Sequence, residues 1–221
     1  MQVSRPFCYA RNVIDICGFC EIMKSRCTLM LTAALLCVSS ASFAADDIAD
    51  KAKICAGCHG ADGVPQLKTM PVIWGQNAGY LFLQLRDFQS GARKNDLMSP
   101  IAANLAREDL LPLAEYFSKL KWPNLNQPPA PQDVATKAVA ANSSVGCTGC
   151  HLDHFQGDGS TARLAGQQHD YLIKTMTDFR TGARGNNPGM SDLMKATAPD
   201  DLEALATYLA GLQIDQYLGN K

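Results

Sequence analysis

Apolar residues recur every three or four positions in several separate stretches of this chain, and strict alternation of apolar and polar residues is absent. The spacing predicts helices over six segments, 47–58, 78–90, 107–120, 132–147, 169–181 and 199–212. Acidic residues near the starts of the third and sixth segments suit the positive end of a helix dipole. The segments between are rich in Gly, Pro and Asn, as loops are. The predicted fold class is all-α.

The six predicted helices form two sets of three, because the sequence repeats itself at an offset of 91 or 92 residues. The matching positions keep the same order in both copies. They are Gly75-Gln76 with Gly166-Gln167, Tyr80-Leu81 with Tyr171-Leu172, Asp87-Phe88 with Asp178-Phe179, Gly91-Ala92-Arg93 with Gly182-Ala183-Arg184, Met98 with Met190, and Asp109-Leu110 with Asp201-Leu202. The chain is therefore expected to hold two tandem homologous domains.

A proline-rich segment separates the two copies. Residues 122–131 contain four prolines, so this stretch cannot continue a helix and is expected to be stiff and extended. The predicted boundaries are residues 46–121 for the first domain, 122–131 for the linker and 132–218 for the second domain. Each domain is small enough to need a bound group to complete its core.

The N-terminus has the pattern of a secretory leader that starts at Met23. Two basic residues precede an apolar run over 29–38, and Ser42-Phe43-Ala44 offers small residues at a cleavage site. We expect residues 23–44 to be a signal peptide cleaved near Ala44, residues 1–22 to be an over-extended start, and the mature protein to be periplasmic. A buried apolar helix is the alternative.

Composition and charge narrow the class of protein. Apolar residues make up 47% of the chain and charged residues 19%, which favours a packed fold over disorder. Beyond residue 44 there are 16 Lys and Arg against 19 Asp and Glu, a net charge of −3. This gives no support to a nucleic-acid partner and slightly favours a partner with a positive patch. No apolar run reaches the roughly 18 residues of a membrane span.

Four of the nine cysteines lie in two identically spaced motifs, and the other five precede residue 45. The motifs are Cys55-Ala56-Gly57-Cys58-His59 and Cys147-Thr148-Gly149-Cys150-His151. Cys-x-x-Cys-His is the attachment sequence of c-type haem. We therefore expect two covalently bound haems c, with thioether bonds to both cysteines of each motif and the histidine as proximal iron ligand. A zinc site would need both motifs on one metal, which their separate repeats contradict.

The second axial ligand is expected to be methionine, the usual partner of histidine in electron-carrying cytochromes. Of the five methionines beyond the leader, only Met98 and Met190 correspond between the repeats, each 39 residues after its own histidine in a predicted loop. Met194 is the rival ligand for the second iron. Met70 and Met176 are interpreted as packing residues, and His154 and His169 as surface histidines.

Several further residues are expected to support the two irons. The carbonyl of Pro71, and that of Ala162 in the second repeat, are candidates to accept the ring N–H of the histidines. The repeated Arg93 and Arg184 are either propionate partners or surface residues. The repeated aromatic residues are expected to pack against haem or the helix core. These are Tyr80, Tyr171, Phe88 and Phe179.

With these motifs, the sequence resembles the cytochrome c4 family over essentially its whole length beyond the leader. The resemblance rests on Cys-Ala-Gly-Cys-His-Gly-Ala-Asp-Gly at 55–63, Leu-Ala-Gly-Gln at 164–167 and the two late methionines. It implies two cytochrome c folds related by a pseudo-twofold axis, His/Met ligation in each, and electron delivery from a quinol-oxidising complex to a terminal oxidase or similar acceptor. Peripheral membrane association is left open. Trp74 and Ala162 depart from the family pattern.

The residues predict an electron carrier rather than an enzyme, and no catalytic residue is assigned. If each iron has two protein ligands, no coordination position is open to a substrate. A dihaem peroxidase or a thiosulfate-oxidising cytochrome, which needs one open or unusually ligated iron, is the alternative from another class. A cytochrome subunit docked permanently on a dehydrogenase is the third hypothesis.

Overall fold

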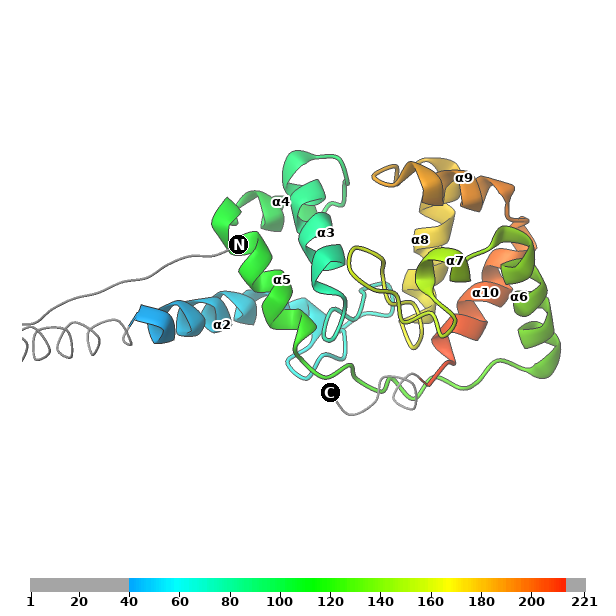
Figure 1. The fold of residues 1–221 in the computed structure, drawn as a ribbon, viewed down its shortest axis with the longest axis horizontal. Coiled ribbons are helices and arrows are strands. Elements are labelled where there is room, and N and C mark those ends of the chain that lie inside the picture. Colours follow the sequence, from blue (N-terminus) through cyan, green and yellow to red (C-terminus); the bar gives the residue numbers. More distant parts are fainter. Residues whose placement is uncertain (1–39, 214–221) are drawn as a thin grey trace, which may run out of the picture. The chain divides into compact units, whose positions relative to one another are not determined.

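Figure 1 shows a computed structural model of the chain, which describes residues 40–213. The predicted over-extended start (1–22) and nearly all of the predicted signal peptide (23–44) lie outside the described residues. Within 40–213 the regular structure is helical and no strand occurs, as expected. No helix in this range is both long enough and apolar enough to span a membrane. The described residues from 46 onward belong to one compact unit, in which we call 46–121 the first half and 132–213 the second half.

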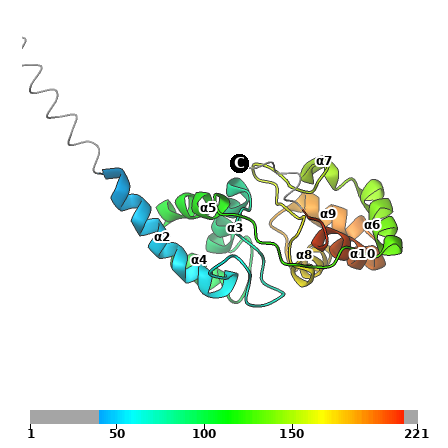
Figure 2. The same ribbon diagram turned by 90° about the horizontal axis from the view of Figure 1, so that it is seen from below.

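The two halves contain corresponding helices. In the first, α2 spans Ser40–His59, α3 spans Ala78–Ser90, α4 spans Met98–Ala103, and a 3-10 turn, η1, at Arg107–Asp109 leads into α5 at Leu110–Ser118. In the second, α6 spans Gln132–Val145, α7 Thr148–His151, α8 His169–Thr181, α9 Pro188–Ala196 and α10 Pro199–Ala210. Figure 2 shows α10 between α6 and α8, and it packs against both.

The segment before each attachment motif differs between the halves. In the first half α2 runs unbroken through the motif to His59. In the second, α6 ends at Val145 because Gly146 adopts a left-handed conformation with φ 80°, and the motif itself forms the short helix α7. The prediction of one helix over 132–147 was wrong at this point. Glycine at position 146, where the first repeat has Ile54, gives the backbone this freedom.

The predicted loops around Met98 and Met190 are instead the starts of short helices. Met98 is the first residue of α4 and Met190 the third of α9. The reason is local capping: the side chain of Asn95 accepts the N–H of Met98 at 2.9 Å, and that of Asn187 accepts the N–H of Met190 at 3.0 Å. An asparagine that accepts an otherwise free N–H nucleates the first helical turn.

Each half has an apolar core built on its last helix. Leu113 of α5 and its counterpart Leu205 of α10 are almost completely buried, with 1% and 2% exposure. Burial of a leucine of this kind contributes about 2 kcal/mol. The second core also takes in Val72 of the first half and Trp122, so the apolar surfaces of the two halves are not independent.

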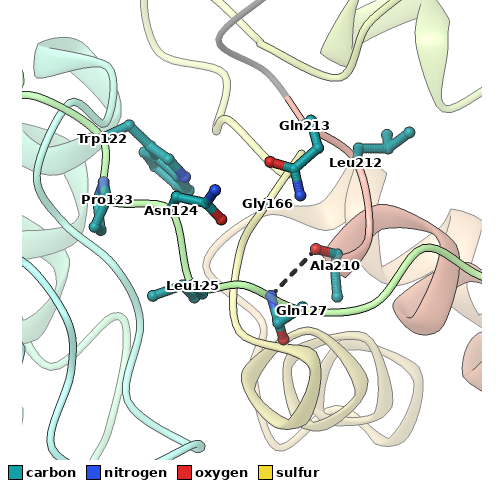
Figure 3. Close-up of a pocket in the computed structure, with 9 residues that line it drawn as sticks. All are labelled: Trp122, Pro123, Asn124, Leu125, Gln127, Gly166, Ala210, Leu212 and Gln213. Carbon is teal, nitrogen blue, oxygen red and sulfur yellow. Dashed lines mark hydrogen bonds between the residues drawn. The ribbon is translucent and has the colours of Figure 1, made fainter.

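The predicted linker is free of helix over 122–131, as expected, but it is firmly attached to the second half. The amide of Gln127 donates to the carbonyls of Gln167 and Ala210, and its oxygen accepts the N–H of His169. Figure 3 shows the small pocket that the linker forms with Gly166 and Leu212. Its volume of about 20 Å³ has room for one water molecule and not for a cofactor.

Candidate haem-attachment sites

The motif histidines are oriented in the same way in both halves. His59 and His151 are each 7% exposed. Their Nδ1 atoms lie 2.8 Å from the carbonyl oxygens of Pro71 and Ala162, which confirms the two predicted partners. A carbonyl only accepts, so Nδ1 carries the proton and Nε2 keeps its lone pair. Both imidazoles therefore have one nitrogen available for a metal.

The surroundings of both histidines favour the neutral ring. Burial lowers the pKa of His59 and of His151 below the ordinary value, and the carbonyl that each ring faces opposes this only in part. A neutral imidazole with a free Nε2 is the form that binds iron. Within 40–213 no group of three or more His, Cys, Asp and Glu side chains is placed to hold a metal ion without a macrocycle.

The two cysteines of each motif differ in exposure. Cys58 and Cys150 are exposed, whereas Cys55 and Cys147 are partly buried, and burial raises the pKa of the latter two thiols. None of the four forms a disulfide bond with another described cysteine. Cys55 and Cys58 are three residues apart in α2, so their side chains lie on one face of the helix. Both thiols therefore lie on the same side of the helix, which attachment to a single flat macrocycle requires.

The backbone turns sharply after each histidine. Gly60 has φ 90°, and a Cβ atom there would lie 2.1 Å from the carbonyl oxygen of Val64. Only glycine fits this turn. The second repeat has Leu152 at the equivalent position, and it too has a positive φ, of 65°. A branched side chain in this region is strained by about 1–2 kcal/mol.

The predicted distal ligands lie on different elements from the histidines. Met98 and Met190 are half-buried at the starts of α4 and α9. Met194, the rival, is 3% exposed and belongs to the second apolar core, as does Met176 at 7%. The interpretation of Met176 as a packing residue is confirmed.

The repeated arginines differ in burial, Arg184 being buried and Arg93 half-buried, and neither is paired with a carboxylate among the described residues. Arg184 is 6% exposed, and its guanidinium lies 4.3 Å from the ring centre of Phe179. Arg93 lies in the same way 4.5 Å over Phe88. The two phenylalanines are buried, as expected. Buried cations normally have an anionic partner, but none of the ion pairs in the described part of the chain includes Arg93 or Arg184.

These residues fit haem, which brings two carboxylates per macrocycle. Besides the two arginines, the indole N–H of Trp74 is buried and has no hydrogen-bond partner among the described residues. Trp74 follows Pro71, the residue that orients His59, by three positions. In the first half, an unpaired buried donor occurs together with two thiols and a histidine that has a free nitrogen, and a covalently bound, anionic macrocycle would satisfy all of them.

The repeated tyrosines have a role that the sequence analysis did not foresee. The hydroxyl of Tyr171 accepts from Arg93 of the other half at 3.3 Å, and the hydroxyl of Tyr80 accepts from Arg184 at 3.5 Å. Packing against haem or the helix core was the expectation. The two Arg–Tyr pairs instead cross between the halves.

A second crossed pair is formed by the repeated glutamines, which the sequence analysis did not assign to a site. Gln76 is bonded to both the N–H and the carbonyl of Arg163, at 2.7 and 2.9 Å. Gln167 is bonded in the same way to Val72, at 2.7 and 3.0 Å. A sequence signal for this contact was present. The Gly-Gln pair is repeated at a fixed offset just before a helix, although glutamine has no role as a haem ligand there.

The two remaining histidines lie away from these contacts. His169 is half-buried, and its ring nitrogens face the carboxylates of Asp170 and Glu203, each at 2.9 Å. His169 is thus a partly exposed histidine whose partners are carboxylates at the surface, in agreement with the expectation of a surface residue. His154 is exposed, as expected.

Two repeats of this kind, each with a Cys-x-x-Cys-His motif and a histidine prepared for iron, define the class of dihaem c-type cytochromes. No family model matches the chain. Individual relatives do. Cytochrome c4 of Azotobacter vinelandii is 32% identical over 212 residues, which cover 86% of this chain and 99% of the relative. The thiosulfate dehydrogenase electron acceptor of Stutzerimonas stutzeri is 34% identical over 180 residues, covering 73% and 80%.

Solved structures agree with these relatives. The structure of reduced recombinant cytochrome c4 from Pseudomonas stutzeri matches with a TM-score of 0.67 and 30% identity, over 76% of this chain and 98% of that one. The chain belongs to the cytochrome c4 family. It is an all-α, dihaem electron-transfer cytochrome with two cytochrome c domains and two covalently bound haems c.

Proposed function

We propose that the protein is a periplasmic electron carrier in which both irons have histidine and methionine as axial ligands. In this proposal Cys55, Cys58, Cys147 and Cys150 form the thioethers, His59 and His151 are the proximal ligands, and Met98 and Met190 are the distal ligands. Each haem carries one electron as its iron cycles between the ferric and ferrous states.

The observation that carries the proposal is the equivalence of the two sites. In each half the Nδ1 atom of the histidine lies 2.8 Å from a backbone carbonyl oxygen, which leaves Nε2 as the nitrogen that would bind an iron. Each half also starts a short helix near a methionine 39 residues later. Two closed irons leave no position for a substrate, which supports electron transfer without turnover.

The choice of Met190 over Met194 is supported by burial. Met194 is 3% exposed and its counterpart Ala102 in the first half is fully buried, so this position faces the helix core in both halves. Met190 is only half-buried, like Met98. Met190 and Met194 lie four residues apart on one face of α9, so what distinguishes them is burial: the thioether of Met194 is enclosed by the second apolar core, and that of Met190 is only partly covered.

We further propose the cellular setting and the domain boundaries. The leader pattern supports export with cleavage near Ala44, which agrees with haem attachment outside the cytoplasm. The extended segment 122–131 supports boundaries at 46–121 and 132–218. Electrons would arrive from a quinol-oxidising complex and leave to a terminal oxidase or similar acceptor.

A second candidate donor is a thiosulfate-oxidising dehydrogenase. Two relatives are named thiosulfate dehydrogenase electron acceptors, one 34% identical over 180 residues and one 32% identical over 189. In that case the protein remains a carrier, but its partner is an enzyme of sulfur oxidation. Reduction by a thiosulfate dehydrogenase with thiosulfate, compared with reduction by a quinol-oxidising complex, distinguishes the two donors.

The visible spectrum of the purified holoprotein tests the closed-iron proposal. Two low-spin haems with the weak far-red band of a methionine–iron bond in the oxidised protein are expected. A high-spin component in the resting protein, or steady turnover with peroxide, would contradict the proposal and favour the enzyme hypothesis.

A further inference from the structure

One side-chain oxygen joins the cationic groups of both halves. The Oε1 atom of Gln84, in α3 of the first half, accepts from Arg93 at 2.9 Å and from Arg184 at 2.8 Å. It also accepts from Asn186 at 3.1 Å. Arg93 belongs to the first half, whereas Arg184 and Asn186 belong to the second. Gln84 is therefore the point at which the two crossed Arg–Tyr pairs meet.

This arrangement holds two like charges close together. Because both guanidinium groups lie within 3 Å of the same oxygen, their bonded nitrogens are no more than about 6 Å apart. Neither is in an ion pair within the described range. The carboxylate of Asp87 accepts from Asn186 at 2.7 Å and pairs with Arg86, and its carbonyl accepts the backbone N–H of Arg93 at 2.9 Å. Each guanidinium is also bonded to a tyrosine hydroxyl, and the shared acceptor offsets part of the repulsion between the two arginines.

The acceptor is present in only one of the two repeats. The position that corresponds to Gln84, at the offset of 91, is Thr175, whose side chain is too short to replace it. The arginines, the tyrosines and the phenylalanines under the arginines are all duplicated. One residue of the first half thus positions the cation of both halves.

Each arginine is also close in the chain to its own predicted iron ligand. Met98 lies five positions after Arg93, and Met190 lies six positions after Arg184. A buried positive charge near a haem favours the ferrous state, because reduction removes one positive charge from the iron. A guanidinium beside the haem of its half would therefore raise the reduction potential of that haem, by an amount that depends on its position.

We propose that Gln84 is a positioning residue that holds Arg93 and Arg184 together and thereby sets the reduction potential of both haems from a single site. The inference rests on the proposed function in two ways. It requires the two bound haems, and it uses the proposed ligands Met98 and Met190 because the arginines lie shortly before them in the chain. Gln84 thus links the reduction potentials of the two haems, which neither repeat could do alone.

The test compares Gln84→Ala with Gln89→Ala in the holoprotein. Gln89 lies in the same helix, and its amide bonds only to first-half carbonyls, those of Ala102 and Leu105. A redox titration followed by visible spectroscopy gives the two midpoint potentials. In Gln84→Ala the equilibrium constant for reduction of each haem is expected to fall about threefold to tenfold, as for the loss of one charge-assisted hydrogen bond. In Gln89→Ala the second potential is expected to stay unchanged.

Gln84→Glu separates positioning from simple structural support. Its carboxylate can still accept from both arginines, so the thermal midpoint of the protein should be retained, while the added negative charge lowers both potentials. In Gln84→Ala no charge is added, and a residue with a structural role alone would then lower the thermal midpoint and leave both potentials unchanged. An unchanged second potential in both Gln84 variants, with the methionine–iron band retained, overturns the inference. A missing band in the wild-type protein would instead contradict the proposed ligands.

Discussion

Gln167 forms a closed pair of hydrogen bonds with the backbone of Val72, 95 residues earlier in the chain. The N–H of Val72 donates to its side-chain oxygen at 2.7 Å, and its amide donates back to the carbonyl of Val72 at 3.0 Å. Both residues are almost completely buried. Gln76 forms the same pair of hydrogen bonds with Arg163. The two halves are therefore joined by buried glutamines whose amide oxygen and nitrogen both bond to the other half.

These glutamines are expected to couple the unfolding of the two domains. Gln167→Ala leaves the N–H and carbonyl of Val72 buried and unpaired, which should lower the free energy of unfolding by about 2–4 kcal/mol. Urea unfolding of the wild-type holoprotein should show one transition, and that of the variant two, as the halves separate. Exposed Gln66 provides the control, because Gln66→Ala should change stability by less than about 0.5 kcal/mol. A single, unshifted transition in Gln167→Ala would contradict the coupling.

The methionine assignment predicts three distinct outcomes. Met98→Ala and Met190→Ala should each remove about half of the methionine–iron band, because each removes one of two equivalent ligands. Met194→Ala should retain the whole band but lower stability by about 2–4 kcal/mol, because it opens a cavity in the second core. Spectra and melting curves of the three proteins check this. Loss of half the band in Met194→Ala, with the band intact in Met190→Ala, would reverse the assignment.

The turns after the two histidines should respond in opposite ways to substitution. Gly60→Ala places a methyl group 2.1 Å from the carbonyl oxygen of Val64, so the first haem should be lost or the protein should fail to accumulate. Leu152→Gly relieves a φ of 65° and should stabilise the second half, by up to about 1 kcal/mol once the lost side-chain contacts are counted. Gly185→Ala is the control, since no heavy atom lies within 4 Å of the added Cβ and the residue lies outside both attachment motifs. Haem content and thermal midpoints are the measurements.

Tyr171 is expected to make stability depend on pH. Burial raises the pKa of its phenol, but the Arg93 and Arg184 guanidinium groups lower it further, to about 7. The phenol of the unfolded chain ionises near 10, so between about pH 7 and 10 the folded state holds fewer protons and stability rises with pH. This contribution is lost as the pH falls through 7. Unfolding free energies measured across this range should show the rise in the wild type and in Tyr80→Phe. The same slope in Tyr171→Phe would assign it to another group.

The sequence was most informative where a motif or a repeat carries its own chemistry. The helical class and the carbonyls of Pro71 and Ala162 follow from spacing, and the structure agrees on both. Local backbone chemistry was harder to foresee: the caps of Asn95 and Asn187 turned two predicted loops into helices.

The contacts between the halves were not predictable from either repeat alone. Gln76, Gln84 and Asn186 have no catalytic or ligand motif, and their partners lie 87 to 102 residues away. Only the crossing of the two copies gives them a role. A residue repeated in both copies without a local function, such as the Gly-Gln pair, is the pattern that indicates such a contact.

The crossed glutamines also describe how the chain is related to a simpler molecule. Val72 and Arg163 occupy the same position in the two repeats, as do Gln76 and Gln167, so residue i of one half binds residue j of the other and the reverse. This is the rule of an isologous interface, the kind that joins identical subunits in a twofold dimer. In these terms the contact between the two halves has the symmetry of a homodimer interface, although both halves belong to one chain. Once they were joined, the partners were free to diverge, as Gln84 and Thr175 have done.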